Sequence, residues 1–247
     1  MELQEYITMF ESEDTHWWYR GLHELVARYT SQQIREKGSI RLLDAGCGTG
    51  GALEFLGIDD SWGMDFSADA IKLCQSRNLT GLARASLESI PFVDNNFDIV
   101  ISLDVLYHRC VQDDLAALKE LHRVLVPGGL LLLNLPAYDF LRSSHDEAIH
   151  TGRRFTRAKL DKNLKICGFE KRKVYYRNSL LMPLAAAVRL CRKGINRKSP
   201  RLISDVEENN SFLNSLFLEI MRAENRFHSA GFSLPFGLSV FAVSQKN

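Results

Sequence analysis

The 247-residue chain is predicted to adopt an α/β fold whose sheet is covered by helices on both faces. Two observations support this class. Apolar runs suited to buried strands alternate with amphipathic stretches from about residue 40 to residue 178, which is typical of βαβ units. In addition, the glycine-rich segment RLLDAGCGTGG connects the first apolar run to a stretch of helical character. The length fits one large domain with a substantial core.

The apolar runs give the expected strands, and capping residues give the helices between them. We expect strands at 40–45, 61–65, 81–85, 97–103, 129–135 and 170–178, and a last strand at 238–244. Ser67 is a plausible N-cap of one helix, and Asp113 or Asp114 begins the next. A third helix is expected over 156–167, where Gly168 ends it.

Two helical additions flank this core. Residues 1–38 form an N-terminal cap, in which an i, i+3, i+4, i+7 apolar pattern follows the aromatic run HWWYR at 16–20. The core itself spans 39–178, and residues 237–247 supply its final strand. Residues 179–236 are a helical insertion, with helices expected around 180–191 and 205–228. The first helix has a leucine-rich face, and the second carries Phe212, Leu216, Ile220 and Phe227 at helical spacing. Both faces must be buried, and we expect the two helices to pack over the carboxyl edge of the sheet and to roof a pocket there.

Composition limits the location and the covalent chemistry. The longest apolar run, 180–188, has nine residues, whereas a membrane-spanning helix needs about 20. The first ten residues do not resemble a signal peptide, so a cytoplasmic protein is expected. Cysteines 47, 74, 110, 167 and 191 include no CxxC pair, which favours free thiols over disulfides or a zinc site.

The charge is balanced overall but uneven along the chain. The formal net charge is +1, yet residues 153–201 contain sixteen Lys or Arg against Asp161 and Glu170. This stretch, which includes Arg189, Arg192 and Lys193, indicates a solvated face or a surface that attracts an anionic substrate or partner. Peripheral contact with an anionic membrane is a less favoured alternative.

The glycine-rich segment predicts a site for an adenosine-type ligand. Asp44 ends a buried strand, and glycines at 46, 48, 50 and 51 let a flat ligand approach the backbone without Cβ collisions. Asp65 ends the next strand, 19 residues after Gly46, where a carboxylate can accept hydrogen bonds from ribose hydroxyls. NAD and S-adenosylmethionine (SAM) both present such a ribose, and the glycines also match GxGxxG.

Two further features favour SAM. The turn follows a helical cap instead of opening the chain, and Asp44 suits the cationic methionine end of SAM but would repel a pyrophosphate. An NAD-dependent oxidoreductase remains the alternative enzyme. The non-enzymatic alternative is a partner subunit that binds SAM but catalyses no reaction.

The strings ASLESIPFVDNNFDIVISLDVLYH and LKELHRVLVPGGLLLLNLP resemble class I SAM-dependent methyltransferases of the type that methylates small molecules. The resemblance implies a Rossmann-like, doubly wound, seven-stranded sheet with an antiparallel last strand. The segments HWWYRG, PAYDFLRSSHDEAIHTGRRFTR and LPFGLSVFAV are similar to a bacterial subgroup associated with glycan or secondary-metabolite pathways.

The resemblance also implies a set of cofactor-binding positions, extended here by neighbouring residues. They are Asp44, Gly46, Cys47, Gly48 and Gly50 in the turn, Asp65, Phe66 and Ser67 after the second strand, Ser86, Leu87 and Glu88 beside adenine, and Leu103 and Asp104 beneath the methionine. Many relatives carry Asp where this chain has Ser86, so backbone groups or Glu88 would have to read adenine. From the cap, Tyr19 and Arg20 are expected to close over SAM, or alternatively to pack the cap onto the core.

Methyl transfer is a direct displacement, so the protein's main task is to align donor and acceptor away from water. A base is needed only if the acceptor must lose a proton, and His108 and His145 are the candidates. His108 follows the fourth strand by five residues, which suits the start of a helix. Trp18, Tyr107, Tyr138 and His150 are candidate substrate contacts. The spacing of His145, Asp146 and His150 is not HExxH, and no metal is expected.

The sequence therefore predicts an enzyme that transfers a methyl group from SAM to an N or O atom of a small-molecule acceptor. The acceptor is anionic if the basic stretch borders its entrance. No nucleic-acid partner is expected, because the basic stretch contains no RNA-binding motif.

Overall fold

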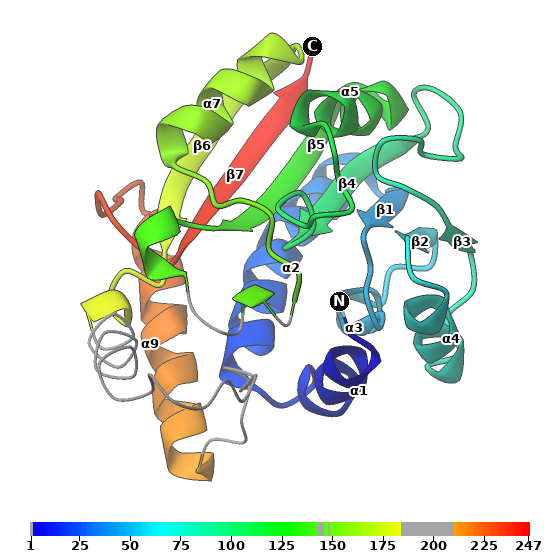
Figure 1. The fold of residues 1–247 in the computed structure, drawn as a ribbon. Coiled ribbons are helices and arrows are strands. Elements are labelled where there is room, and N and C mark those ends of the chain that lie inside the picture. The colour runs from blue at the N-terminus through cyan, green and yellow to red at the C-terminus, as the bar shows by residue number, and fades with distance from the viewer. Residues whose placement is uncertain (1, 143–145, 148, 184–209) are drawn as a thin grey trace.

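The fold is described from a computed structural model, which covers residues 2–142, 146–147, 149–183 and 210–247. Its strands are β1 (Leu42–Ala45), β2 (Ser61–Asp65), β3 (Leu82–Arg84), β4 (Phe97–Leu103), β5 (Leu125–Pro136), β6 (Phe169–Arg177) and β7 (Ser239–Lys246). They form one sheet in the order β3-β2-β1-β4-β5-β7-β6 (Figure 1). Strand β7 is antiparallel to both of its neighbours, and the other pairs are parallel. The predicted seven-stranded sheet with an antiparallel last strand is confirmed.

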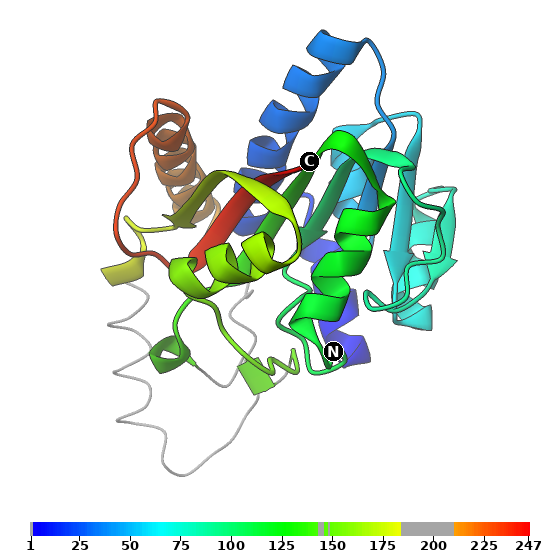
Figure 2. The same cartoon turned by 90° about the horizontal axis from the view of Figure 1, so that it is seen from above.

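Helices cover both faces of the sheet. They are α1 (Leu3–Ser12), α2 (Trp17–Lys37), α3 (Gly51–Leu56), α4 (Ala68–Ser76), α5 (Asp114–Val124), α7 (Arg157–Ile166) and α9 (Ser211–Ser229), with a 3-10 turn η1 at Asp139–Leu141. Figure 2 shows α5 and α7 on one side of the strands and α2 and α9 on the other. In the described residues, no helix has the length and apolarity needed to cross a membrane.

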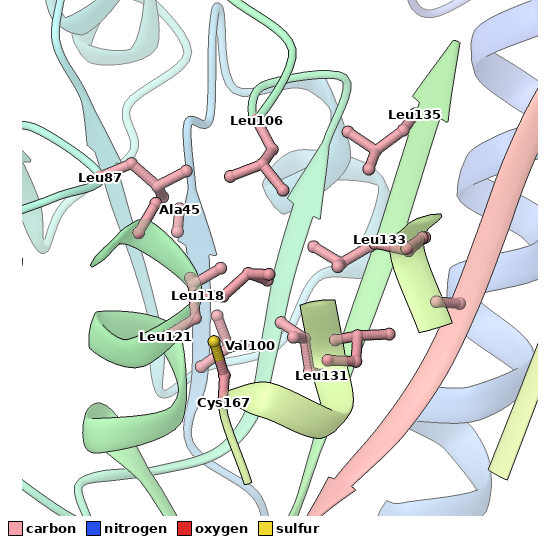
Figure 3. Packing of buried hydrophobic residues seen from close by; sticks show 14 of the residues in the cluster. Ala45, Leu87, Val100, Leu106, Leu118, Leu121, Leu131, Leu133, Leu135 and Cys167 are labelled. Atoms are coloured by element: carbon pink, nitrogen blue, oxygen red, sulfur yellow. The ribbon is translucent and has the colours of Figure 1, made fainter. Parts of the chain in front are cut away.

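Two apolar layers hold this arrangement together. Under α5 and α7, Leu118 and Leu121 pack on the β-strand residues Val100, Leu131 and Leu133, all of them buried (Figure 3). On the opposite face, residues of α2, among them Leu22, Leu25 and Val26, pack with alternate residues of the same strands. Because both faces of β4 and β5 are covered, most residues of these strands are apolar, with few of the polar alternations of a half-exposed strand.

The predicted helix starts agree with the capping geometry. Ser67 accepts a hydrogen bond from the amide of Ala70, and Asp113 accepts from the amide of Leu115 at 2.8 Å. Thr156 caps α7 in the same way, and Gly168 follows its last turn with a positive φ of 85°. One helix was not foreseen as a separate element: α1 precedes the aromatic run, whose first residue, His16, is the N-cap of α2.

The prediction for the second helix of the insertion was right in position and wrong in orientation. Helix α9 packs against α2, where Asn225 donates to the carbonyl of Gly21 at 3.0 Å and Arg222 pairs with Glu24. The face expected to be buried is largely exposed, with Phe212 at 72%. Leu216 and Phe227 are exposed as well, and Ile220 is half-buried.

The buried face of α9 is instead partly polar, because its side chains hold neighbouring backbone. Glu224 accepts hydrogen bonds from the amides of Ser179 and Leu180, just beyond β6, and from His228. Most of the helix expected around 180–191 lies outside the described residues. Arg189, Arg192 and Lys193 lie outside them too, together with Cys191.

Candidate functional site: the carboxyl edge of the sheet

The turn after β1 depends on glycine. Gly46 has a φ of 98°, and a Cβ at this position would lie 2.2 Å from Cγ2 of Val105, in the segment after β4. The amides of Gly46 and Cys47 both donate to the carbonyl of Met64, at 2.7 and 2.9 Å. The turn is therefore fastened to β2 on one side and packed against the end of β4 on the other.

Asp65, at the end of β2, organises two backbone segments. Its Oδ2 accepts a hydrogen bond from the amide of Gly48 at 3.0 Å, and its Oδ1 accepts from the amide of Ser67 at 2.8 Å. These two bonds lower the pKa of the carboxyl, but burial raises it more, so the net pKa lies above its usual value. Each oxygen has a second lone pair, which leaves acceptor capacity for ribose hydroxyls.

Asp44 fits a cationic ligand group. Its side chain is 2% exposed, and within the described part of the chain Oδ1 has no hydrogen-bond partner. Burial and the nearby carboxylates of Asp65 and Glu13 raise its pKa well above the usual value. A buried carboxyl with an unmet acceptor is costly without a partner. The positively charged methionine end of SAM would relieve that cost, so the residues present fit this cofactor.

Helix α1 covers the same turn, although none of its residues was predicted to belong to the site. The terminal methyl of Met9 lies 2.6 Å from where a Cβ on Gly48 would be. The phenol of Tyr6 is within hydrogen-bonding reach of Asp65 and Ser67. The signal was present in the sequence, since Tyr6, Met9 and Glu13 share one helical face by their i, i+3, i+7 spacing.

Glu13 anchors the end of α1 to the glycine turn. Its buried carboxylate accepts hydrogen bonds from the hydroxyl of Thr49 and, at 2.9 Å, from Nη2 of Arg77. Arg77 also donates to the carbonyl of Phe10 at 3.2 Å. Burial outweighs these contacts and raises the pKa of Glu13 to about 7.

The residues expected beside adenine have mixed environments. Phe66 is 56% exposed, so its ring is open to a ligand, whereas Leu87 belongs to the buried core. The Ser86 hydroxyl accepts from the amide of Glu88 at 3.2 Å. Oε1 of Glu88 accepts from the amides of Gln112 and Asp113, at 3.2 and 2.8 Å, so this carboxylate also fixes the approach to α5.

Asp104 lies at the end of β4, next to the glycine turn. Its φ is 58°, an uncommon value for a residue other than glycine, and such backbone outliers concentrate at functional sites. Burial raises the pKa of its carboxyl to about 6. Burial raises the pKa values of Tyr19, from α2, and of Tyr107, and the negative charge of Asp104 raises both further, which places these three side chains in one region. Leu103 is half-buried and packs on the α2 side of the sheet.

The prediction that His108 begins a helix is wrong. It lies in a turn that makes an isolated β-bridge with Thr151, and α5 begins only after Asp113. Its Nδ1 accepts from the amide of Cys110 at 3.2 Å, and its ring lies 5.8 Å from that of His150. Burial lowers the pKa of His108 to about 4.

The other candidate side chains are dispersed along the same edge. His150 has a φ of 54°, and its Nε2 lies 2.9 Å from Oε1 of Glu2. Trp18 meets Trp17 edge to face, and Tyr138 stacks on Tyr176 with 5.1 Å between ring centroids. Arg20 is half-buried in the first turns of α2, and His145 lies outside the described residues.

Asp146 has a structural partner. Its two oxygens accept from Nε and Nη2 of Arg154, at 2.9 and 2.8 Å, and both side chains are buried. Arg154 also donates to the carbonyl of Ala137, which ties this loop to the end of β5. In the described ranges, no group of three or more His, Cys, Asp or Glu is placed to hold a metal ion.

Comparison with known proteins agrees with this geometry. Residues 43–133 match a family described as a methyltransferase domain. Over 102 residues the chain is 36% identical to a probable tRNA methyltransferase 9B of Bos taurus, a match that covers 41% of this chain and 22% of that protein. Over 115 residues it is 37% identical to a phthiotriol/phenolphthiotriol dimycocerosates methyltransferase of Mycobacterium ulcerans, covering 44% and 40%.

Among solved structures, the chain is similar to an SAM-dependent methyltransferase of Thermotoga maritima, with a TM-score of 0.59 and 19% identity over 99% of this chain and 96% of that one. At this identity the similarity shows the fold alone. The chain spans less than half of the length of the two curated relatives described above. The segment 43–133, which carries the glycine turn, Asp65 and Asp104, therefore matches a methyltransferase domain, and SAM is its cofactor.

Proposed function

We propose that the protein transfers the methyl group of SAM to an N or O atom of a small-molecule acceptor. The observation that carries the proposal is the hydrogen bond between the amide of Gly48 and Asp65, because it joins the two cofactor-binding segments at the carboxyl edge of a parallel sheet. SAM supplies an electrophilic methyl group. The protein's contribution is to bind, orient and exclude water.

The residues divide into three groups around that edge. Asp44, the glycine turn and Asp65 would hold the cofactor, with Phe66 beside adenine and Asp104 near the methionine. Tyr19 and Arg20 would close the site from α2. The acceptor would be surrounded by His108, Tyr107, Trp18, Tyr138 and His150. Because its pKa is lowered to about 4, His108 is neutral at any pH well above that value and so is in the form that a base requires.

An acceptor screen tests the proposal. The purified protein is incubated with SAM carrying a labelled methyl group and with pools of small metabolites, and products heavier by one methylene are identified by mass spectrometry. We expect labelled products only in small-molecule pools. Since one relative carries the name of a tRNA methyltransferase, total tRNA is included as a separate pool. Label in tRNA alone would contradict the small-molecule assignment, and SAM binding without any transfer would favour a partner subunit.

A further inference from the structure

A chain of hydrogen bonds crosses the carboxyl edge of the sheet from β6 to β4. Nη1 of Arg177 donates to Oδ1 of Asn134 at 3.1 Å, and Nδ2 of Asn134 donates to Oδ2 of Asp104 at 2.8 Å. Arg177 and Asn134 are both fully or almost fully buried, at 2% and 0% exposure. Arg177 and Asp104, the first and last residues linked by these hydrogen bonds, are 73 residues apart in the sequence, so only the fold brings them together.

Arg177 reaches β5 by passing over the intervening strand. In the register, Phe241 of β7 lies opposite Asn134 on one side and Tyr175 on the other. The guanidinium of Arg177 lies over the Phe241 ring, 5.6 Å from its centroid. Gly237, just before β7, makes room for the strand, because a Cβ there would lie 2.3 Å from the carbonyl oxygen of Arg177.

Arg177 fixes the orientation of the Asn134 amide. A guanidinium has donors and no acceptor, so the amide must present its oxygen to Arg177. Its NH₂ group then necessarily faces Asp104. If the amide were reversed, its oxygen would meet the carboxylate of Asp104 and its NH₂ group would meet a cation. The arginine thus acts on Asp104 through the asparagine, without direct contact.

Asn134 holds Asp104 at two points. Besides the side-chain bond, the carbonyl of Asn134 accepts from the amide of Asp104 at 2.8 Å, which fixes the backbone in its left-handed conformation. Among the described residues, Oδ1 of Asp104 accepts no hydrogen bond, so this oxygen is left for a ligand.

The surroundings of Asp104 affect the charge of its carboxyl in opposite directions. Burial disfavours its charge, and Asn134, Arg177 and Arg154 favour it. Among the described residues, the phenols of Tyr19 and Tyr107 are also titratable neighbours of Asp104. Of the two cations, Arg177 lowers the pKa of Asp104 more than Arg154 does, and it is also the one that is hydrogen-bonded to Asn134.

We propose that Asn134 and Arg177 are positioning residues, which keep Asp104 ionised and hold one of its oxygens towards the cationic methionine end of SAM. The choice of SAM as the ligand rests on the proposed function. The hydrogen bonds that link Arg177 to Asp104 through Asn134 are made between protein groups and do not depend on that choice.

The first test measures the titration of the Asp104 carboxyl in the absence of SAM. Protein labelled with ¹³C at aspartate side-chain carboxyls is titrated by NMR, and the Asp104 signal is identified by its loss in Asp104→Asn. We expect Asp104 to titrate near pH 6 in the original protein and about one pH unit higher or more in Arg177→Met. Arg177→Lys should restore much of the original behaviour, and Arg172→Met, at an exposed position on the same strand, should change nothing. An unchanged titration in Arg177→Met would overturn the proposal.

The second test measures SAM affinity by calorimetry at pH 6.5 and pH 8.5. Arg177→Met should weaken binding several-fold more at pH 6.5 than at pH 8.5, and should add nothing when Asp104→Asn is already present. An equal loss at both pH values, or full additivity, would show a structural role alone. If Arg177→Met does not fold, Asn134→Ser removes the bond to Asp104 and gives the same readouts. Because the NMR titration needs no SAM, it can succeed even if SAM does not bind, which separates this proposal from the proposed function.

Discussion

The amide of Gly48 donates a hydrogen bond to Oδ2 of Asp65 across 3.0 Å, and this bond couples the turn after β1 to the end of β2. The carboxylate that would hold the ribose therefore also shapes the turn that would hold the methionine. Substitutions in either segment are expected to affect the other.

The two glycines of the turn should differ in their tolerance of a side chain. Gly46→Ala places a Cβ against the branched side chain of Val105, which is stiff, and should reduce the free energy of unfolding by about 2–4 kcal/mol. Gly48→Ala meets only the flexible end of Met9, so its cost should be that of the positive φ, about 1–2 kcal/mol. Urea unfolding of the two variants measures both values. A larger loss for Gly48→Ala would contradict the packing described here.

His108→Ala should slow methyl transfer by about 100-fold if His108 takes a proton from the acceptor, with little change in SAM affinity. Since burial lowers the pKa of His108 to about 4, the rate of the original protein should stay level from pH 7 down to about pH 5 on account of this group. His122→Ala, at a histidine that packs on Phe169 away from the site, is the matched control. Equal losses of rate in both variants would remove His108 from the chemistry.

His23 should make stability fall in mild acid. It is 5% exposed, and burial lowers its pKa to about 4 in the folded protein, against about 6.5 when unfolded. Between these values the unfolded state binds the proton and the folded state does not, so stability decreases as the pH falls from 6.5 to 4. From pH 7.5 to pH 5 the original protein should lose about 2 kcal/mol more than His23→Gln.

Chemical denaturation at the two pH values gives this difference directly. Comparing the variant with the original protein cancels the opposite contributions of Glu13 and Asp104, whose raised pKa values favour folding as the pH falls. A parallel loss in both proteins would show that His23 is protonated in the folded state.

The fold was predictable because its signals are local. Strands β2 and β4 have the predicted bounds. The signal for β4 is its largely apolar run, as expected for a buried parallel strand. Ser67, Asp113 and Thr156 mark helix starts because a cap bonds to amides two or three residues away.

The features that the sequence did not predict depend on contacts between segments that are far apart along the chain. The buried face of α9 carries Glu224 and Asn225 because their partners lie just beyond β6 and on α2, which no helical periodicity can show. The link from Arg177 to Asp104 likewise depends on β7 lying between β5 and β6. His108 was misplaced because the chain makes a turn and a β-bridge before Asp113 can cap a helix.

The most direct test of the central claim is calorimetric titration of SAM into the original protein, Asp65→Ala and Asp69→Ala. Asp69 is a half-exposed residue of the neighbouring helix α4 that pairs only with Lys72 among the described residues, so it controls for loss of a charge. We predict that SAM binds the original protein and Asp69→Ala alike, and that Asp65→Ala weakens binding by about 1–3 kcal/mol, because the ribose hydroxyls lose a charged acceptor. Equal SAM affinity in all three proteins, or no SAM binding by the original protein, would contradict the account.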